Sequence, residues 1–189
     1  MRKLKLQVQL SVDGYIAGPA GEMDWMVWDW DDDLKKYVQD ITEPVETIIL
    51  GRKLAEGFIP TWTSILENPD TADDSARKFV ETPKVVFTKT LESTEWKATE
   101  LAKGDLTEEI TKLKNSEGDD IIAYGGGTFV TALIKAGLID EFHLFVNPVV
   151  LGSGMTIFEG ATYHETLTLV ESRSFECGIV LLCYEKNIE

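Results

Sequence analysis

The feature that most constrains the fold is a short apolar strand that runs into three glycines and then directly into a helix. Residues 119–124 predict a buried strand, residues 125–127 are all glycine, and residues 128–136 carry apolar side chains at helical spacing. Gly137 is placed to end that helix. Glycine lets a ligand approach the backbone, and a helix start offers free N–H groups, so the turn predicts a phosphate or pyrophosphate cradle. A tight turn that binds nothing remains the alternative.

The rest of the chain also alternates between strand and helix patterns. Strands are predicted over residues 3–12, 47–50, 83–88 and 141–150. Helices are predicted over residues 32–41, 72–81 and 105–115. This alternation indicates an α/β protein with a mostly parallel sheet.

Three further expectations concern the connections and the tail. Residues 59–71 are expected to be irregular, and Thr71 is a plausible N-cap for the helix that follows. The tail, residues 166–185, predicts two strands around Cys177 and Gly178, which form an antiparallel hairpin. Such a hairpin adds an antiparallel edge to the parallel sheet.

Composition excludes several classes of protein. The 189 residues fit one domain, residues 1–189. With 18 basic and 33 acidic residues the net charge is −15, which disfavours nucleic-acid partners. The sequence contains no apolar run long enough for a membrane span and no signal-peptide pattern, so we expect a cytoplasmic protein. Two cysteines and two histidines without a ligand pattern predict no metal site.

A second predicted strand end carries cations. Residues 47–50 run into Gly51, Arg52 and Lys53, where a helix is expected to begin. Cations at a helix start oppose the helix dipole, so a bound anion would relieve the conflict. A third strand end carries Thr88 and Lys89. Three such ends at one edge of a sheet suggest a ligand that spans them, and two anion sites suit a dinucleotide.

No pair of a nucleophile and a base is recognisable. His143 lies between Phe142 and Leu144 in a predicted strand and is interpreted as structural. Four tryptophans lie in segments without a clear helix or strand pattern: Trp25, Trp28, Trp30 and Trp62. They predict either an aromatic wall of a binding pocket or a contact between two subunits, and the sequence leaves both open.

Five segments, taken in order, resemble the dihydrofolate reductase-like superfamily. They are residues 9–18, 49–54, 85–88, 124–128 and 138–154. The closer similarity is to the branch related to the C-terminal reductase domain of the bifunctional riboflavin-biosynthesis deaminase-reductase. The deaminase half is absent, since the chain has no HxE and no PCxxC pattern.

The resemblance implies a three-layer α/β/α fold with a central mixed, mainly parallel sheet and a C-terminal antiparallel hairpin. It implies NADPH as the cofactor and hydride transfer to a heterocyclic or ribosylamino-pyrimidine substrate, as in a 5-amino-6-(5-phosphoribosylamino)uracil reductase. The cofactor-binding positions that it implies are Ile16, Ala17, Gly51, Arg52, Lys53, Leu54, Thr88, Lys89, Tyr124, Gly125, Gly126, Gly127, Thr128 and Phe129. Arg52 and Lys89 favour NADPH over NADH, because a 2′-phosphate needs cationic partners.

The resemblance also implies the substrate side of the site. An acid on the first helix followed by an aromatic residue one turn later matches Asp33 and Tyr37, with Asp33 as the candidate for proton delivery. Trp25 and Trp62 would line the substrate pocket. Phe145 stands where dihydrofolate reductases keep a threonine, which argues against dihydrofolate as the substrate. Members of this branch are often homodimers.

Two other classes of function stay open at this point. One is a non-catalytic or regulatory nucleotide-binding module that kept the fold. The other is a dimeric scaffold with an empty cleft.

Overall fold

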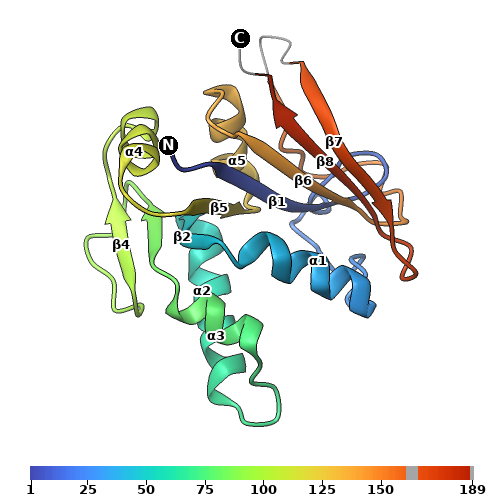
Figure 1. Ribbon diagram of the computed structural model, residues 1–189, viewed down its shortest axis with the longest axis horizontal. Coiled ribbons are helices and arrows are strands. Elements are labelled where there is room, and N and C mark those ends of the chain that lie inside the picture. Colours follow the sequence, from blue (N-terminus) through green and yellow to red (C-terminus); the bar gives the residue numbers. More distant parts are fainter. Residues whose placement is uncertain (161–165, 188–189) are drawn as a thin grey trace.

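The computed structural model describes residues 1–160 and 166–187 (Figure 1). Its strands are β1 (Leu4–Leu10), β2 (Val45–Gly51), β3 (Lys84–Phe87), β4 (Thr99–Ala102), β5 (Asp120–Tyr124), β6 (Glu141–Val146), β7 (Leu167–Ser174) and β8 (Val180–Lys186). Its helices are α1 (Asp32–Thr42), α2 (Arg52–Glu67), α3 (Asp74–Glu81), α4 (Leu106–Asn115) and α5 (Gly127–Lys135). No helix within the described ranges is long and apolar enough to cross a membrane.

The strands form one sheet in the order β4-β3-β2-β5-β1-β6-β8-β7. The first six strands in this order are mutually parallel, whereas β8 runs antiparallel to β6 and β7 runs antiparallel to β8. The predicted mixed sheet with a C-terminal antiparallel hairpin is therefore confirmed. Because the parallel strands all end at the same side, we call that side the carboxyl edge of the sheet.

Helices cover both faces of the sheet. On one face α4 and α5 pack through Ile110, Val130 and Leu133 against the apolar side of β1 and β5. On the other face α2 and α3 pack on β2 and β3, and α1 packs on β6 and β8 through Leu34 and Ile41. Figure 1 shows α1, α2 and α3 on one side of the sheet and α4 and α5 on the other. The implied three-layer arrangement is thus present.

Two local expectations are wrong. Residues 59–67 are not irregular, because α2 continues through Pro60 to Glu67, and of the expected irregular segment only residues 68–71 lie outside a helix. Proline removes one helix hydrogen bond, but Ile59 and the partly buried Trp62 and Leu66 recur at helical spacing and pack into the same core. The buried face therefore outweighs the local cost of the proline.

The N-cap of α3 is also not the predicted residue. The cap is Asp73, whose carboxylate accepts the N–H of Ala76 at 2.7 Å. The hydroxyl of Thr71 instead donates to the carbonyl of Ile65 at 3.0 Å, behind the end of α2. A carboxylate at this position also interacts favourably with the helix dipole, which a hydroxyl does not.

Candidate functional site

The helices that follow β2 and β5 leave the carboxyl edge in opposite directions. β2 and β5 are parallel neighbours in the sheet. α2 follows β2 and packs on one face, whereas α5 follows β5 and packs on the other. Adjacent strands whose helices diverge in this way mark the position where open α/β sheets bind ligands. The structure therefore points to the edge between β2 and β5.

These two helices also differ from the other three in how they begin. The starts of α1, α3 and α4 are capped by the carboxylates of Asp31, Asp73 and Asp105. α2 and α5 begin after Gly51 and Gly126, and within residues 1–160 and 166–187 neither helix start has a side-chain cap. Their first N–H groups and positive dipole ends are left for an external acceptor. An anion such as a pyrophosphate is the acceptor that this arrangement suits.

The glycine turns that precede the two helices touch each other. A Cβ placed on Gly51 would lie 2.7 Å from the Cβ of Phe129 at the start of α5. A Cβ on Gly126 would lie 3.5 Å from the Cβ of Leu54, and one on Gly127 would lie 3.5 Å from the Cδ1 of Ile16. Gly126 has φ +87°, a conformation that side chains disfavour. The structure thus brings together members of the expected cofactor set from three separate segments.

The loop of Ile16 and Ala17 is held beside these turns by backbone pairing. The N–H of Ile16 donates to the carbonyl of Met155 at 2.8 Å, and the N–H of Met155 donates to the carbonyl of Ala17 at 2.8 Å. A Cβ on Gly154 would lie 2.2 Å from the carbonyl oxygen of Ala17. Glycine at position 154 is therefore required for this close approach.

The basic side chains expected to hold phosphate are engaged within the protein. Arg52 forms an ion pair with Glu56 one turn along α2, at 2.7 Å. The ammonium of Lys89 donates to the carbonyls of Lys103 and Gly104, each at 2.9 Å. Lys53 is exposed. A phosphate would therefore have to compete with a carboxylate for Arg52 and with two carbonyls for Lys89.

Thr88 and Tyr124 have structural contacts as well. The buried hydroxyl of Thr88 accepts the N–H groups of Thr90 and Leu91, which shapes the turn after β3. Tyr124 points to the α2 face, where its ring packs against Phe58 and Phe79 at centroid distances of 5.6 Å and 6.0 Å. Burial raises the pKa of the Tyr124 phenol. Its hydroxyl is therefore neutral at physiological pH.

Asp33 and Tyr37, one turn apart on α1, point to different surroundings. The exposed carboxylate of Asp33 pairs with Arg173 on β7 at 3.0 Å. Tyr37 turns inward, and its hydroxyl hydrogen-bonds with Nδ1 of His143 on β6 at 3.0 Å. Burial raises the pKa of the Tyr37 phenol. The structure does not bring these two expected substrate residues to one point.

The tryptophans are also separated. Trp62 does not lie in a loop, because it belongs to α2, where its ring stacks on Phe79 at 5.4 Å. The indole N–H of Trp25 donates to the carbonyl of Glu22, and that of Trp30 donates to the carbonyl of Val27. Trp28 is largely exposed. These four residues therefore do not form one continuous wall.

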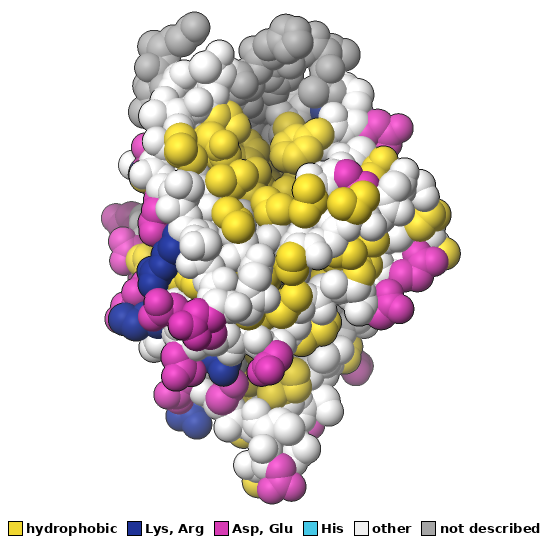
Figure 2. All heavy atoms as spheres, turned by 90° about the vertical axis from the view of Figure 1, so that its right-hand side faces the viewer, with side chains coloured by type: hydrophobic (Ala, Val, Ile, Leu, Met, Phe, Trp, Pro, Cys, Tyr) yellow, Lys and Arg dark blue, Asp and Glu magenta, His cyan; other side chains and the backbone are white. Residues whose placement is uncertain are grey.

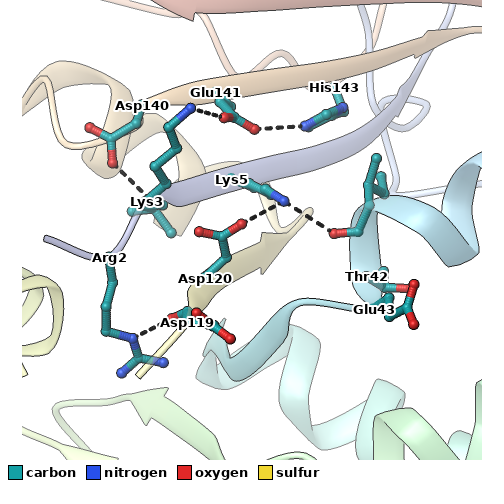
Figure 3. Close-up of polar contacts among 12 residues, drawn as sticks. Arg2, Lys3, Lys5, Thr42, Glu43, Asp119, Asp120, Asp140, Glu141 and His143 are labelled. Carbon is teal, nitrogen blue, oxygen red and sulfur yellow. Dashed lines mark hydrogen bonds and ion pairs between the residues drawn. The ribbon is translucent and has the colours of Figure 1, made fainter. Parts of the chain in front are cut away.

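Sequence reasoning missed a row of polar side chains on β1 that faces α1. This polar row is Lys5, Gln7 and Gln9. Figure 3 shows Lys5 beside Asp120 on β5, at an Nζ–Oδ2 distance of 2.7 Å. The same alternating pattern that predicted the strand contained the signal, but its meaning depends on β1 being central in the sheet. The sequence alone does not establish that position.

His143 lies next to the polar row and links α1 to β6. Its Nε2 lies 3.4 Å from Glu141, which also pairs with Lys3 at 2.5 Å (Figure 3). The hydrogen bond from His143, together with Lys3, holds the pKa of Glu141 at about 2 despite its burial. His143 is therefore a structural contact of Tyr37, in line with the interpretation from sequence.

Sequence comparison identifies the family of this chain. Residues 2–181 match the sequence model of the RibD C-terminal domain. The chain belongs to the RibD C-terminal domain family. It is 34% identical to the uncharacterized protein YyaP of Bacillus subtilis, over 98% of this chain and 96% of that protein. The uncharacterized protein YwjB of the same organism is 29% identical, over 95% and 96% of the two chains.

Solved structures confirm the RibD-type fold. A putative riboflavin biosynthesis protein from Shewanella sp. PV-4 has a TM-score of 0.71 at 21% identity, with both chains covered completely at 100%. A diaminohydroxyphosphoribosylaminopyrimidine deaminase/5-amino-6-(5-phosphoribosylamino)uracil reductase from Thermotoga maritima has a TM-score of 0.69 at 18% identity. That alignment covers 98% of this chain and 57% of the other. The RibD C-terminal fold, related to dihydrofolate reductase, is thus established for this chain.

Proposed function

We propose that this protein is an NADPH-dependent reductase. It would transfer a hydride to a C=N or C=O carbon of a pyrimidine-like, pteridine-like or ribosylamino-pyrimidine substrate. The observation that carries the proposal is the pair of uncapped helix starts at touching glycine turns between β2 and β5. Membership of the RibD C-terminal domain family supports the same reading.

The residues at the carboxyl edge fit a dinucleotide. The uncapped N–H groups of α2 and α5 would hold the pyrophosphate, and the missing side chains of Gly126 and Gly127 would let it approach the backbone. Ile16 and Ala17 would lie beside the nicotinamide. Arg52 and Lys89 would hold the 2′-phosphate after leaving their present partners. The bound cofactor would supply the hydride, while the chain orients it and excludes water.

The protonation step is best assigned to water. The ion pair with Arg173 presents Asp33 as a carboxylate, which accepts hydrogen bonds rather than donating a proton. In that state Asp33 suits the amino edge of a pyrimidine. Its role would be substrate binding, and the proton would come from solvent admitted beside α1.

A second candidate function is a nucleotide-binding module that has lost turnover. The observation in its favour is the divergence of Asp33 and Tyr37, which leaves the expected substrate side without a shared point of contact. Oxidation of NADPH in the presence of pyrimidine and pteridine acceptors distinguishes the two candidates, because the module would bind the cofactor and consume none.

The proposed assembly is a homodimer that forms at the hairpin. β7 is the last strand of the sheet and exposes Leu169 and Val170, and β8 exposes Val180. Figure 2 shows hydrophobic side chains gathered on this side of the molecule. Sedimentation of the wild type and of Leu169→Lys tests the assembly, since a dimer through this strand would become a monomer.

Titration with NADPH and, separately, with NADH tests the main proposal. The readout is nicotinamide fluorescence. Binding of NADPH in the micromolar range with discrimination against NADH supports the reductase. Absence of binding to either cofactor overturns both the reductase and the nucleotide-binding module.

A further inference from the structure

The central strand of the sheet carries polar side chains on a covered face. β1 lies between β5 and β6, and helices cover both sides of the sheet at this point. Strands in such positions are usually apolar on both faces. The face toward α4 and α5 follows this rule, with buried leucine and valine side chains. The face toward α1 carries the polar row Lys5, Gln7 and Gln9 instead.

Two members of the polar row have partners. The buried Lys5 pairs with Asp120 at 2.7 Å and also reaches the carbonyl of Ile41 at 3.4 Å. Gln9 accepts a hydrogen bond from the Nδ2 of Asn147 at 2.8 Å. These two side chains are therefore explained by the fold itself.

Gln7 has no such explanation. Gln7 is more than nine-tenths buried, with 8% of the residue exposed. Its Oε1 is completely covered and accepts no hydrogen bond from the residues that the structure describes. Buried polar atoms in folded proteins nearly always have a partner, and an orphaned acceptor is costly. A ligand that donates a hydrogen bond is one way to remove that cost.

The position of Gln7 connects it to the proposed cofactor edge. In the sheet register Gln7 is paired with Tyr124 on β5 and with His143 on β6. Tyr124 is the last residue of β5 and directly precedes the glycine turn that starts α5. Gln7 is therefore level with the carboxyl end of β5, on the face covered by α1. A substrate beside the nicotinamide on that face would reach this carboxamide once the side chains that cover its Oε1 move aside.

The other covered atom without a partner in the described ranges is Nε1 of Trp62. Trp62 contacts Phe58 and Phe79, and these two rings in turn pack on Tyr124. Phe58 and Phe79 therefore lie between Trp62 and β5, whereas Gln7 is on the strand next to β5.

We infer that the carboxamide oxygen of Gln7 determines specificity by accepting a hydrogen bond from a ring N–H of the hydride acceptor. This inference rests on the proposed reductase function and names the class of substrate more closely. The class is a neutral lactam-type heterocycle, because an amide oxygen binds a donor and carries no net charge. The neighbouring cation, Lys5, is already neutralised by Asp120, so the polar row offers no free charge for an anionic group.

Two pyrimidine probes test the inference. 5,6-Diaminouracil has ring N–H donors, and 5,6-diamino-1,3-dimethyluracil has the same ring with those donors blocked. Each probe is titrated calorimetrically into the wild type, Gln7→Leu and Gln39→Leu, with and without saturating NADP⁺. Gln39 is an exposed residue of α1, so Gln39→Leu is a matched control for the substitution.

We expect diaminouracil to bind the wild type and Gln39→Leu equally, and to bind Gln7→Leu about tenfold more weakly. The dimethyl analogue should bind wild type and Gln7→Leu alike. Equal affinity of diaminouracil for wild type and Gln7→Leu overturns the inference, and so does a wild type that binds no diaminouracil. Gln7→Met, which fills the same volume without the amide, replaces Gln7→Leu if that variant folds poorly.

The same measurements test the role of Gln7 and the proposed reductase function separately. If NADPH binds and diaminouracil does not, the proposed role of Gln7 is rejected and the proposed reductase function is retained. If diaminouracil binding depends on Gln7 but NADPH does not bind, the proposed reductase function is rejected instead. Thermal unfolding adds a readout, because Gln7→Leu removes an unpaired acceptor and should not lower the melting temperature of the ligand-free protein.

Discussion

The two edges of the parallel sheet differ in whether their polar groups have partners within the protein. At the amino edge three lysines are paired with carboxylates at 2.5 to 2.7 Å. They are Lys3 with Glu141 and Lys5 with Asp120, which Figure 3 shows, and Lys114 with Asp140. At the carboxyl edge two helix starts have no side-chain cap, and the amide oxygen of Gln7 has no partner. Polar groups that the fold leaves unsatisfied are available to a ligand, whereas paired ones hold the fold together.

This difference separates stability from binding. Changes at the amino edge should alter the free energy of unfolding and leave cofactor affinity unchanged. Changes at the carboxyl edge should mainly lower cofactor affinity, with a smaller cost in stability only where a new side chain strains the backbone. Four variants, given in order of decreasing effect, test whether the two edges are independent.

Removing a carboxylate at the amino edge should have the largest effect. Asp120→Ala would leave the buried Lys5 without its counterion, and we expect a loss of about 3–4 kcal/mol in the free energy of unfolding. Denaturant unfolding measures the loss. The double variant Lys5→Met with Asp120→Leu should recover most of it, because it removes both charges. NADPH affinity that changes in parallel would show that the two edges are coupled.

Filling the glycine turn should have the next largest effect. Gly126→Val places a branched side chain at φ +87°, against Leu54 and in the space proposed for the pyrophosphate. We expect NADPH affinity to fall at least about a hundredfold, or ~2.7 kcal/mol. The strain should also cost about 1–2 kcal/mol of stability, so unfolding is measured on the same sample.

Gly57→Ala is the control for this variant. Gly57 lies inside α2 with open space around its missing Cβ. We expect unchanged affinity and a stability gain of about 0.5–1 kcal/mol, since alanine favours the helix. Normal NADPH binding by Gly126→Val would remove the glycine turn from the proposed cofactor site.

The sequence predicted what depends on local pattern. The strand, glycine and helix order around residues 119–137 follows from apolar spacing and glycine alone, and the structure reproduces it. Gly137 ends α5 with φ +62°, as expected. The predicted contact of Asp33 and Tyr37 with one ligand depended on which face of the helix turns toward the sheet. Residue spacing alone does not determine that face.

What the sequence did not predict depends on distant packing. β4 is only four residues long and lies at the edge of the sheet, so its pattern was too short to detect. The continuation of α2 past Pro60 depends on a core that Ile59 shares with α3. The polar row on β1 was visible as alternation, but an alternating strand is ordinarily half exposed. Only the sheet order shows that Gln7 is covered.

A third prediction concerns a lysine at the amino edge for which the described part of the chain provides no carboxylate partner. Lys84, at the start of β3, is 1% exposed, and its ammonium donates to the carbonyls of Val80 and Thr82. Burial lowers its pKa from 10.5 to about 8, with a further contribution from Lys97. Between these values the unfolded chain binds the proton and the folded chain does not, so this group adds stability as pH rises from about 8 to 10.

The variant Lys84→Met isolates that contribution. Cys183 works in the opposite direction in the same pH range, because burial raises its pKa to about 11, but both proteins contain it. We therefore expect the stability of the wild type relative to Lys84→Met to increase by about 2 kcal/mol between pH 8 and pH 10. Denaturant unfolding at several pH values measures this difference. A constant difference would mean that Lys84 keeps its ordinary pKa in the fold.

The smallest expected effect concerns the choice between two cofactors. Arg52 stands in the first turn of α2, where its charge opposes the helix dipole and pairs with Glu56 at 2.7 Å. Arg52→Met should weaken NADPH by about 1.5 kcal/mol, roughly tenfold, and NADH much less, because only NADPH carries the 2′-phosphate. Fluorescence titration with both cofactors measures the ratio, and Lys112→Met on α4 controls for the lost charge. An equal loss of affinity for the two cofactors would assign Arg52 to the shared pyrophosphate. The 2′-phosphate would then depend on Lys89, whose two carbonyl contacts would have to break on binding.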